Sequence, residues 1–331
     1  MKFKEFIGID ISKITFDVRI HNTQESNEFP NNKKGYDRLV KWVEKNTSVE
    51  RLEIVYIFEH TGLYSHNLSI YLSENQIPFV LVPGLEVKKS LGISRGKNDI
   101  VDAKRIANYG FEKRDKLKLY KMPSEELIQL KSLLSLRDRL IKQRTGYKAN
   151  LKEIKEIFVK TDNKILFETQ EKMIKYLSKQ INIIDRQMQD IINKDLELKE
   201  MYDLITSIKS VGMQTALYII VYTNAFTKFE NVRQFASYIG IAPFENSSGS
   251  SVRGRTRVSN LAFKKIKSLM DLCAKSAIVY NNEMKTYYIR RVDEGKSKMS
   301  TINIVRNKLL SRIFAVVKRG TPYVDLTKFA A

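Results

Sequence analysis

The chain has 331 residues, of which 43% are apolar, and its formal net charge at pH 7 is +21. No apolar run reaches the roughly 20 residues needed to cross a bilayer, and residues 1–10 lack the apolar segment and cleavage site of a secretory signal. We therefore expect a cytoplasmic protein with no membrane partner. The one cysteine, Cys273, excludes an internal disulfide and a cysteine-based zinc site.

The charge balance indicates a polyanionic partner, with nucleic acid as the leading candidate, because 58 Lys and Arg face 37 Asp and Glu. The excess is uneven: residues 251–320 hold 17 basic and 4 acidic side chains. A lysine-rich bias spread over solvated surfaces is the ordinary alternative. That bias does not explain why the acids are locally depleted.

Residues 1–120 are predicted to form a mixed α/β domain. Apolar runs predict strands over residues 6–11, 15–20, 53–58 and 78–82, and apolar spacings of three and four predict helices over residues 36–45, 63–74 and 98–112. Strands that alternate with helices in this order favour a sheet covered by helices.

Residues 121–200 are predicted to form a helical arm, because the segment 124–200 has no proline and a single glycine. An apolar stripe with steps of three and four residues is typical of a coiled coil; its members are Ile174, Leu177, Ile181, Ile184, Met188 and Ile191. A break at residues 161–164 would let two helices fold back on each other. The stripe is therefore either the seam of an internal hairpin or a dimer contact, and the residues do not separate the two.

Residues 201–331 are predicted to be mainly helical, with a Gly-, Ser- and Pro-rich interruption at residues 240–254. Residues 207–216 resemble a helix-hairpin-helix turn, whose backbone amides can hold a DNA phosphate. Ser210 stands where such a turn usually has its first glycine. A plain junction between two helices is therefore an equal alternative.

Four acidic side chains occupy positions that suit a metal site. Asp10 lies in an otherwise apolar strand, where an unpaired carboxylate is costly to bury, and Glu59 directly follows an apolar run. Asp99 and Asp102 are three residues apart, so a helix presents both on one face. Oxygen ligands suit Mg²⁺ or Mn²⁺, and two ions about 4 Å apart can activate an attacking oxygen and stabilise a leaving oxygen in phosphodiester chemistry.

Taken singly, each of these acids has an ordinary explanation as a turn residue or as a favourable charge at a helix N-terminus. Their joint order, two strand acids followed by a pair of helix acids, is what a ribonuclease H-like nuclease core requires. Asp17, on the second predicted strand, is interpreted as a residue of the exposed face.

Three segments resemble the acidic motifs of the DEDD insertion-sequence transposases, a family with a RuvC-like catalytic domain. They are residues 8–13 (Gly-Ile-Asp-Ile-Ser-Lys), 59–62 (Glu-His-Thr-Gly) and 97–103 (Lys-Asn-Asp-Ile-Val-Asp-Ala). In that family the four acids bind the metal ions. The resemblance therefore implies a RuvC-like domain and assigns that role to Asp10, Glu59, Asp99 and Asp102.

Residues 242–249 resemble the C-terminal Pro-x4-Ser-Gly motif of the same family and place its serine at Ser248. On its own, this segment is a flexible polar loop. The resemblance implies that Ser248 is the nucleophile that joins covalently to DNA. The three histidines all lie in the first domain and none has an evident triad partner. A metal-bound oxygen or an acid of the first domain could serve as the base instead. This implies that the two domains, from one subunit or two, meet over the scissile phosphate.

Basic residues near these motifs are the candidate nucleic-acid contacts, since cations neutralise phosphate charge. They are Arg95, Lys97, Arg253, Arg255, Arg257, Lys264 and Lys265. The basic spacing after the serine only partly follows the family pattern, and Ser210 and Ser259 replace residues that are often glycine there.

The prediction is a DNA recombinase that cuts and rejoins strands at the ends of an insertion sequence. The resemblance further implies double-stranded DNA at the element ends and target, a structured guide RNA, and a homodimer or dimer of dimers. One alternative is a metal-dependent, junction-resolving nuclease without a covalent intermediate. A second alternative, of another class, is a non-catalytic scaffold that binds nucleic acid.

Overall fold

A computed structural model describes residues 3–60, 62–90, 99–248 and 252–324. The chain divides into two compact units, Met1–Met122 and Pro123–Ala331, each with its own apolar core. Among the described helices, none is both long enough and apolar enough to cross a membrane.

The first unit contains a five-stranded sheet, which confirms the predicted mixed α/β character. Its strands are β1 (Glu5–Ile11), β2 (Thr15–Ile20), β3 (Ser26–Pro30), β4 (Ile54–Glu59) and β5 (Phe79–Val82). The order across the sheet is β3-β2-β1-β4-β5. The pairs β1–β2 and β2–β3 are antiparallel, and the pairs β1–β4 and β4–β5 are parallel. This topology is consistent with the expected RuvC-like core.

Strand β3 was not predicted, because its polar sequence buries only Phe29. It pairs along the outer edge of β2, where backbone hydrogen bonds form without an apolar alternation. The short helix α3 (Gly84–Ser90) was also not predicted. Both elements are too short or too polar to show the periodicity on which the prediction rests.

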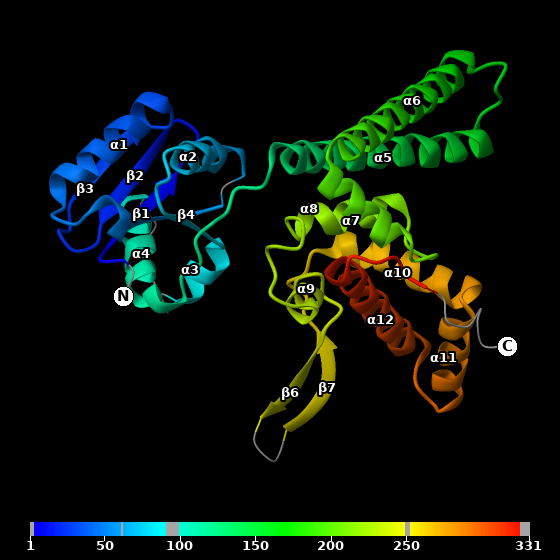
Figure 1. Cartoon of the computed structure of the whole chain (residues 1–331). Helices are drawn as coiled ribbons and strands as arrows, with labels where there is room; N and C mark the ends of the chain where they lie inside the picture. The colour runs from blue at the N-terminus through cyan, green and yellow to red at the C-terminus, as the bar shows by residue number, and fades with distance from the viewer. Residues whose placement is uncertain (1–2, 61, 91–98, 249–251, 325–331) are drawn as a thin grey trace. The chain divides into compact units, whose positions relative to one another are not determined.

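Helices cover both faces of the sheet (Figure 1). On one face, α1 (Lys33–Asn46) and α2 (Leu63–Glu74) pack on the odd-numbered residues of β1. On the other face, α3 and α4 (Asp99–Glu112) pack on a smaller cluster that includes Phe6 and Ile57. Two single-turn 3₁₀ helices, Arg51–Glu53 and Arg114–Lys116, connect these elements. The result is a sheet between two helical layers.

Gly8 determines how closely α4 approaches the sheet. A Cβ atom added at Gly8 would lie deep inside van der Waals contact with the Ala103 carbonyl oxygen and the Ala107 amide nitrogen. Both of those atoms belong to the backbone, so they cannot swing away as a flexible side chain can. Only glycine at this position lets the backbone of α4 rest directly on β1.

The second unit begins with a helical hairpin of α5 (Glu125–Ile157) and α6 (Lys164–Lys194). Side-chain hydrogen bonds join Arg137 to Asp185, Arg144 to Ser178, and Asn150 to Gln170. Because the numbers rise on one helix as they fall on the other, the helices are antiparallel. Leu177, Ile181, Ile184 and Met188 of the predicted stripe are buried, so the stripe forms an internal seam, one of the two arrangements that the sequence left open.

The rest of the second unit is mainly helical, as predicted. Its helices are α7 (Leu196–Thr206), α8 (Met213–Tyr222), α9 (Val232–Tyr238), α10 (Lys264–Tyr280), α11 (Asn282–Asp293) and α12 (Lys298–Arg319). They share one apolar core with the base of the arm, and α8 lies at its centre with seven consecutive buried residues, 215–221. The junction between α7 and α8 is a short connection closed by a hydrogen bond from the Val211 amide to the Ile208 carbonyl.

We expect Gly8→Ala to lower the free energy of unfolding by about 1–3 kcal/mol, since the new methyl group would overpack a backbone contact. Gly146→Ala is the matched control. Gly146 lies at an exposed position inside α5, and an added Cβ would meet nothing within 4 Å apart from its chain neighbours and the backbone of its own helix. Alanine should therefore leave stability unchanged or raise it by up to about 1 kcal/mol. Urea unfolding followed by circular dichroism measures both. Equal stability of the two variants would contradict this role for Gly8.

Candidate active site and basic surfaces

Asp10 and Glu59 lie side by side at the ends of two neighbouring parallel strands. Ile9 of β1 is in register with Phe58 of β4, so the next position along each strand carries an acid. Neighbouring strands are about 4.8 Å apart, and residues in register point to the same face. Both carboxylates are half-buried and belong to the face that α4 covers. The structure thus brings together two acids that are 49 positions apart in the chain.

Helix α4 brings the other two predicted acids towards the same end of the sheet. Its C-terminal part packs on the start of β1, where the rings of Phe111 and Phe6 are 5.8 Å apart. Its middle rests on Gly8. The helix therefore runs antiparallel to β1, and its first turn, with Asp99 and Asp102, lies towards the end of the strand that carries Asp10. Asp99 is described for its backbone only.

The charges of these acids interact. Burial raises the pKa of Glu59 above its ordinary value, the negative charge of Asp102 raises it further, and Lys88 opposes both. Asp102 is paired with Arg105, whose Nη1 lies 2.6 Å from Oδ1. The raised pKa means that nearby positive charges do not fully offset the cost of removing the ionised Glu59 carboxylate from water.

The donor set suits a divalent metal ion in kind. Asp10, Glu59 and Asp102 supply only carboxylate oxygens, which Mg²⁺ and Mn²⁺ prefer, and a cation would offset the burial of Glu59. Among the side chains that the structure describes, no three such groups are close enough to hold an ion as they stand. These acids therefore suit a divalent ion in two respects: they offer oxygen ligands, and they lie towards the same end of the sheet.

Asp17 is placed differently from the sequence interpretation. It pairs with Asp10 across the antiparallel β1–β2 ladder, is half-buried, and shares the face of Asp10. The exposed-face interpretation was therefore wrong. The missing information was the hairpin register, which follows from a turn that hydrogen-bonds Ser12 to Thr15.

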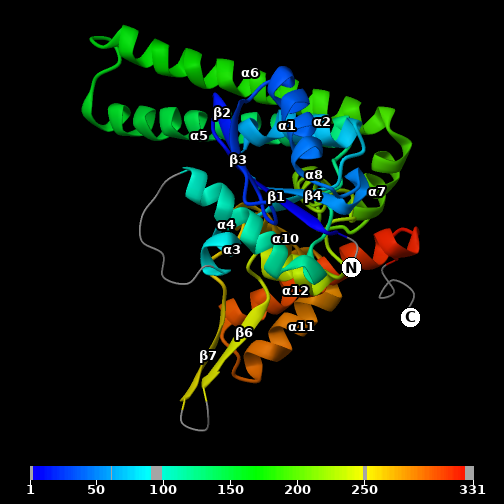
Figure 2. The same cartoon turned by 90° about the vertical axis from the view of Figure 1, so that its left-hand side faces the viewer.

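Ser248 lies on a β-hairpin and not in an irregular loop. Strands β6 (Pro243–Ser248) and β7 (Val252–Val258) pair from Pro243 with Val258 at the base to Ser248 with Val252 at the far end. Figures 1 and 2 show this hairpin projecting from the helical part of the unit. Only the backbone of Ser248 is described.

The predicted nucleic-acid contacts differ in their surroundings. Arg253, Arg255 and Arg257 occupy alternate positions of β7, and Arg257, whose side chain is described, is exposed. Lys264 is exposed at the start of α10. Lys265 donates a hydrogen bond to Asp138 at 2.6 Å, so an acid of the same unit partly neutralises its charge. Arg95 and Lys97 lie outside the described residues.

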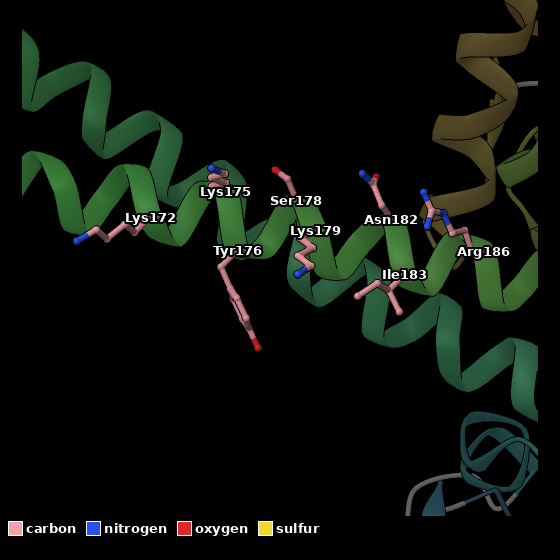
Figure 3. A pocket seen from close by; sticks show the side chains of 8 residues that line it. All are labelled: Lys172, Lys175, Tyr176, Ser178, Lys179, Asn182, Ile183 and Arg186. Atoms are coloured by element: carbon pink, nitrogen blue, oxygen red, sulfur yellow. The ribbon is translucent and has the colours of Figure 1, made fainter.

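A basic surface that the sequence analysis missed lies on the outer face of α6. Four exposed cations border a shallow hollow of about 690 Å³ (Figure 3): Lys172, Lys175, Lys179 and Arg186. Tyr176 and Ile183 lie among them, 57% and 45% exposed. The spacing of three and four residues, opposite the buried stripe, is the signal that could have revealed this surface.

Acids at adjacent strand ends, together with a strongly basic helical unit, are typical of enzymes that act on nucleic acids. A family model of DEDD transposases of the IS110 type, described as "Transposase", matches residues 7–158. A second model, "Transposase IS116/IS110/IS902 family", matches residues 202–289.

Similar proteins agree with these models. The chain is 30% identical to the pilin gene-inverting protein of Moraxella bovis over 335 residues, 97% of this chain and 98% of the relative. It is 23% identical to the transposase for insertion sequence element IS1111A of Coxiella burnetii, over 98% of this chain and 92% of the relative. The chain therefore belongs to the IS110 family of transposases and is a DNA transposase or recombinase, which confirms the resemblance read from the acidic and serine motifs.

We expect Mg²⁺ to raise the melting temperature of the wild-type chain more than that of Glu59→Gln. An acid whose pKa is raised in the folded state destabilises the fold once the pH exceeds that raised pKa, and the effect vanishes below the unfolded value. At neutral pH without metal, Glu59→Gln should therefore melt higher than wild type. Differential scanning fluorimetry with and without Mg²⁺ measures both effects.

Glu74→Gln, at an exposed position of α2, is the control for this comparison. It should respond to Mg²⁺ as the wild type does. A Glu59→Gln variant that gains as much from Mg²⁺ as the wild type would argue against Glu59 as a ligand.

Neutralising Lys172, Lys175 and Lys179 to glutamine should flatten the salt dependence of nucleic-acid binding. Each lost phosphate contact lowers the slope of log K against log salt by about 0.9 for duplex DNA. The control is the same triple change at Lys148, Lys152 and Lys155, exposed lysines of α5. Fluorescence anisotropy over a salt series measures the slope for each variant. Equal slopes for the α6 and α5 variants would show that the α6 surface does not bind nucleic acid.

Proposed function

We propose that the protein cuts and rejoins DNA strands at insertion-sequence ends with two sets of residues. Asp10, Glu59, Asp99 and Asp102 bind Mg²⁺ or Mn²⁺, and Ser248 is the nucleophile. The observation that carries the metal site is the register that places Asp10 beside Glu59, under the helix that bears the other two acids. Such a site is expected at the strand ends of a RuvC-like domain.

The reaction is a pair of transesterifications. The Ser248 oxygen forms an ester with the scissile phosphorus while the bond from phosphorus to the leaving strand oxygen breaks; the serine loses a proton and the leaving oxygen gains one. The phosphoester is thereby conserved, so a second strand hydroxyl can attack it, restore a phosphodiester and release the serine. A bound divalent ion would supply charge stabilisation for the pentacoordinate phosphate.

The positive charge supports polyanionic partners. We propose double-stranded DNA at the element ends and target, together with a guide RNA, as the molecules that the basic hairpin and the α6 surface contact. The IS1111A relative is named a transposase and the Moraxella relative a gene-inverting protein. Both names support an activity that exchanges strands between two DNA sites, for which a homodimer or dimer of dimers would hold the ends.

The test is a covalent protein-DNA species on a denaturing gel after incubation with labelled junction DNA, its flanking RNA and Mg²⁺. Ser248→Ala should abolish the adduct, with a loss of at least about 10³-fold, and Asp10→Asn should do the same because charge stabilisation is lost. Ser247→Ala, the adjacent serine of β6, is the matched control and should retain the adduct.

Two other outcomes would favour the alternative functions. Cleaved DNA without an adduct, unaffected by Ser248→Ala, would identify a hydrolytic nuclease that uses the acids alone. DNA binding without cleavage, unaffected by Asp10→Asn and Ser248→Ala, would identify a non-catalytic scaffold.

A further inference from the structure

A pocket of about 350 Å³, lined mainly by polar and charged residues, lies at the start of α10 within the second unit. Ser259, Asn260 and Lys264 line it from the end of the hairpin and the first residue of the helix, and Lys267, Ser268 and Arg306 line it from α10 and α12. Its volume is at the lower end of the range of ligand pockets. Three of these six side chains are cationic.

Arg306 is held in the wall of this pocket. It is 6% exposed and its Nη2 donates to Asp271, another lining residue. Its Nη1 donates to Asn303 at 3.3 Å. Its buried Nε has no hydrogen-bond partner among the described residues. A buried guanidinium with an unsatisfied donor is costly unless a further acceptor is supplied.

Asp271 does not neutralise the pocket, because its charge is shared. Lys275 binds its other oxygen at 2.8 Å. Although burial acts to raise the pKa of Asp271, hydrogen bonds from Lys275 and Arg306 lower it below its ordinary value. Asp271 is therefore ionised and already paired with two cations, which leaves Lys264 and Lys267 to face the pocket without an ion-pair partner among the described residues.

The start of α10 adds positive potential. Phe263, its N-cap, makes no side-chain capping hydrogen bond, so the first-turn amides keep their capacity to bind an anion. Burial lowers the pKa of Lys267, as do the charges of Arg306 and Lys264. An anion in the pocket would relieve the repulsion among all three cations.

We propose that this pocket binds a phosphodiester group of the DNA strand that Ser248 attacks, which rests on the proposed function. The argument for DNA is position. The pocket adjoins the base of the β6–β7 hairpin, where Pro243 pairs with Val258, and Ser248 lies five residues further along β6. At about 3.3 Å per residue this is roughly 17 Å, or the rise of about five nucleotides of duplex. The pocket would fix the strand about five phosphates from the scissile one.

The first experiment measures duplex binding in EDTA, so that no cleavage occurs. Lys267→Gln should raise the Kd by about tenfold and lower the salt slope by about one, as expected for one charged phosphate contact. Lys285→Gln, an exposed lysine of α11, is the matched control and should bind as the wild type does. Because Lys267 is repelled by its neighbours, its replacement should not lower the melting temperature; Lys264→Gln, at an exposed position, gives a second variant that keeps the fold.

The second experiment replaces the fourth to sixth phosphates from the cleavage site, one at a time, with neutral methylphosphonates. One replacement should weaken wild-type binding about tenfold and leave Lys267→Gln unaffected, because the two changes remove the same interaction. The same DNA tested with Lys285→Gln should behave as with the wild type.

Additive losses, or a Lys267→Gln variant that binds all DNAs as Lys285→Gln does, would overturn the proposal and leave the pocket to another anion, such as an acidic side chain of a second copy. Failure of the adduct assay would count against the serine mechanism alone, since binding in EDTA requires no chemistry.

Discussion

The contact between Gly8 and the backbone of α4 is the constraint on which the first unit depends. Closely packed interiors leave no room for even one methyl group between two backbones, so the sequence at position 8 determines the distance between the helix and the sheet. That distance determines where Asp102 stands with respect to Glu59, whose pKa it raises. Gly8 thus sets how closely the acids of α4 can approach the acids of the strands.

The second unit depends on a different kind of interaction, a polar network that joins the arm to the helical body. Asp138 of α5 accepts hydrogen bonds from Tyr218 of α8 and Lys265 of α10. Asp185 of α6 is bound at once by Arg137 and by Gln214. Partly buried acids with two donors each are well satisfied, and such pairs specify one arrangement of neighbouring helices. The seam of the arm supplies apolar area, and this network positions the arm's base.

The cations of the second unit fall into two groups, those that form ion pairs within the unit and those that border surface hollows. Cations that hold the fold together, such as Lys265 and Arg137, have acidic partners. By contrast, Lys175, Lys179 and Arg186 of α6 and Lys264 and Lys267 of α10 border hollows and have no ion-pair partner among the described residues. A protein that binds long polyanions needs cations without acidic partners. The few acids of the second unit pair instead with the cations that hold its helices together. This explains how a net charge of +21 coexists with an ordered helical body.

The amino-acid sequence by itself determined the features that depend on local periodicity and on residue type. These are the strands with alternating apolar residues, the long helices, the excess of basic charge, and the acidic and serine motifs that place the chain in its family. The sequence did not predict edge strand β3, because its pairing needs no apolar pattern. It did not predict the β6–β7 hairpin either, because the polar residues of the hairpin are equally typical of a loop.

Only the tertiary structure decided the relations between distant segments. It placed Asp10 beside Glu59 and across from Asp17, made the arm's seam internal, and gathered Lys267 and Arg306 around one pocket. The physical reason is that strand register and helix contacts are set by packing among residues far apart in the chain. A one-residue shift in register would leave the local pattern almost unchanged and turn every side chain of the strand to the opposite face.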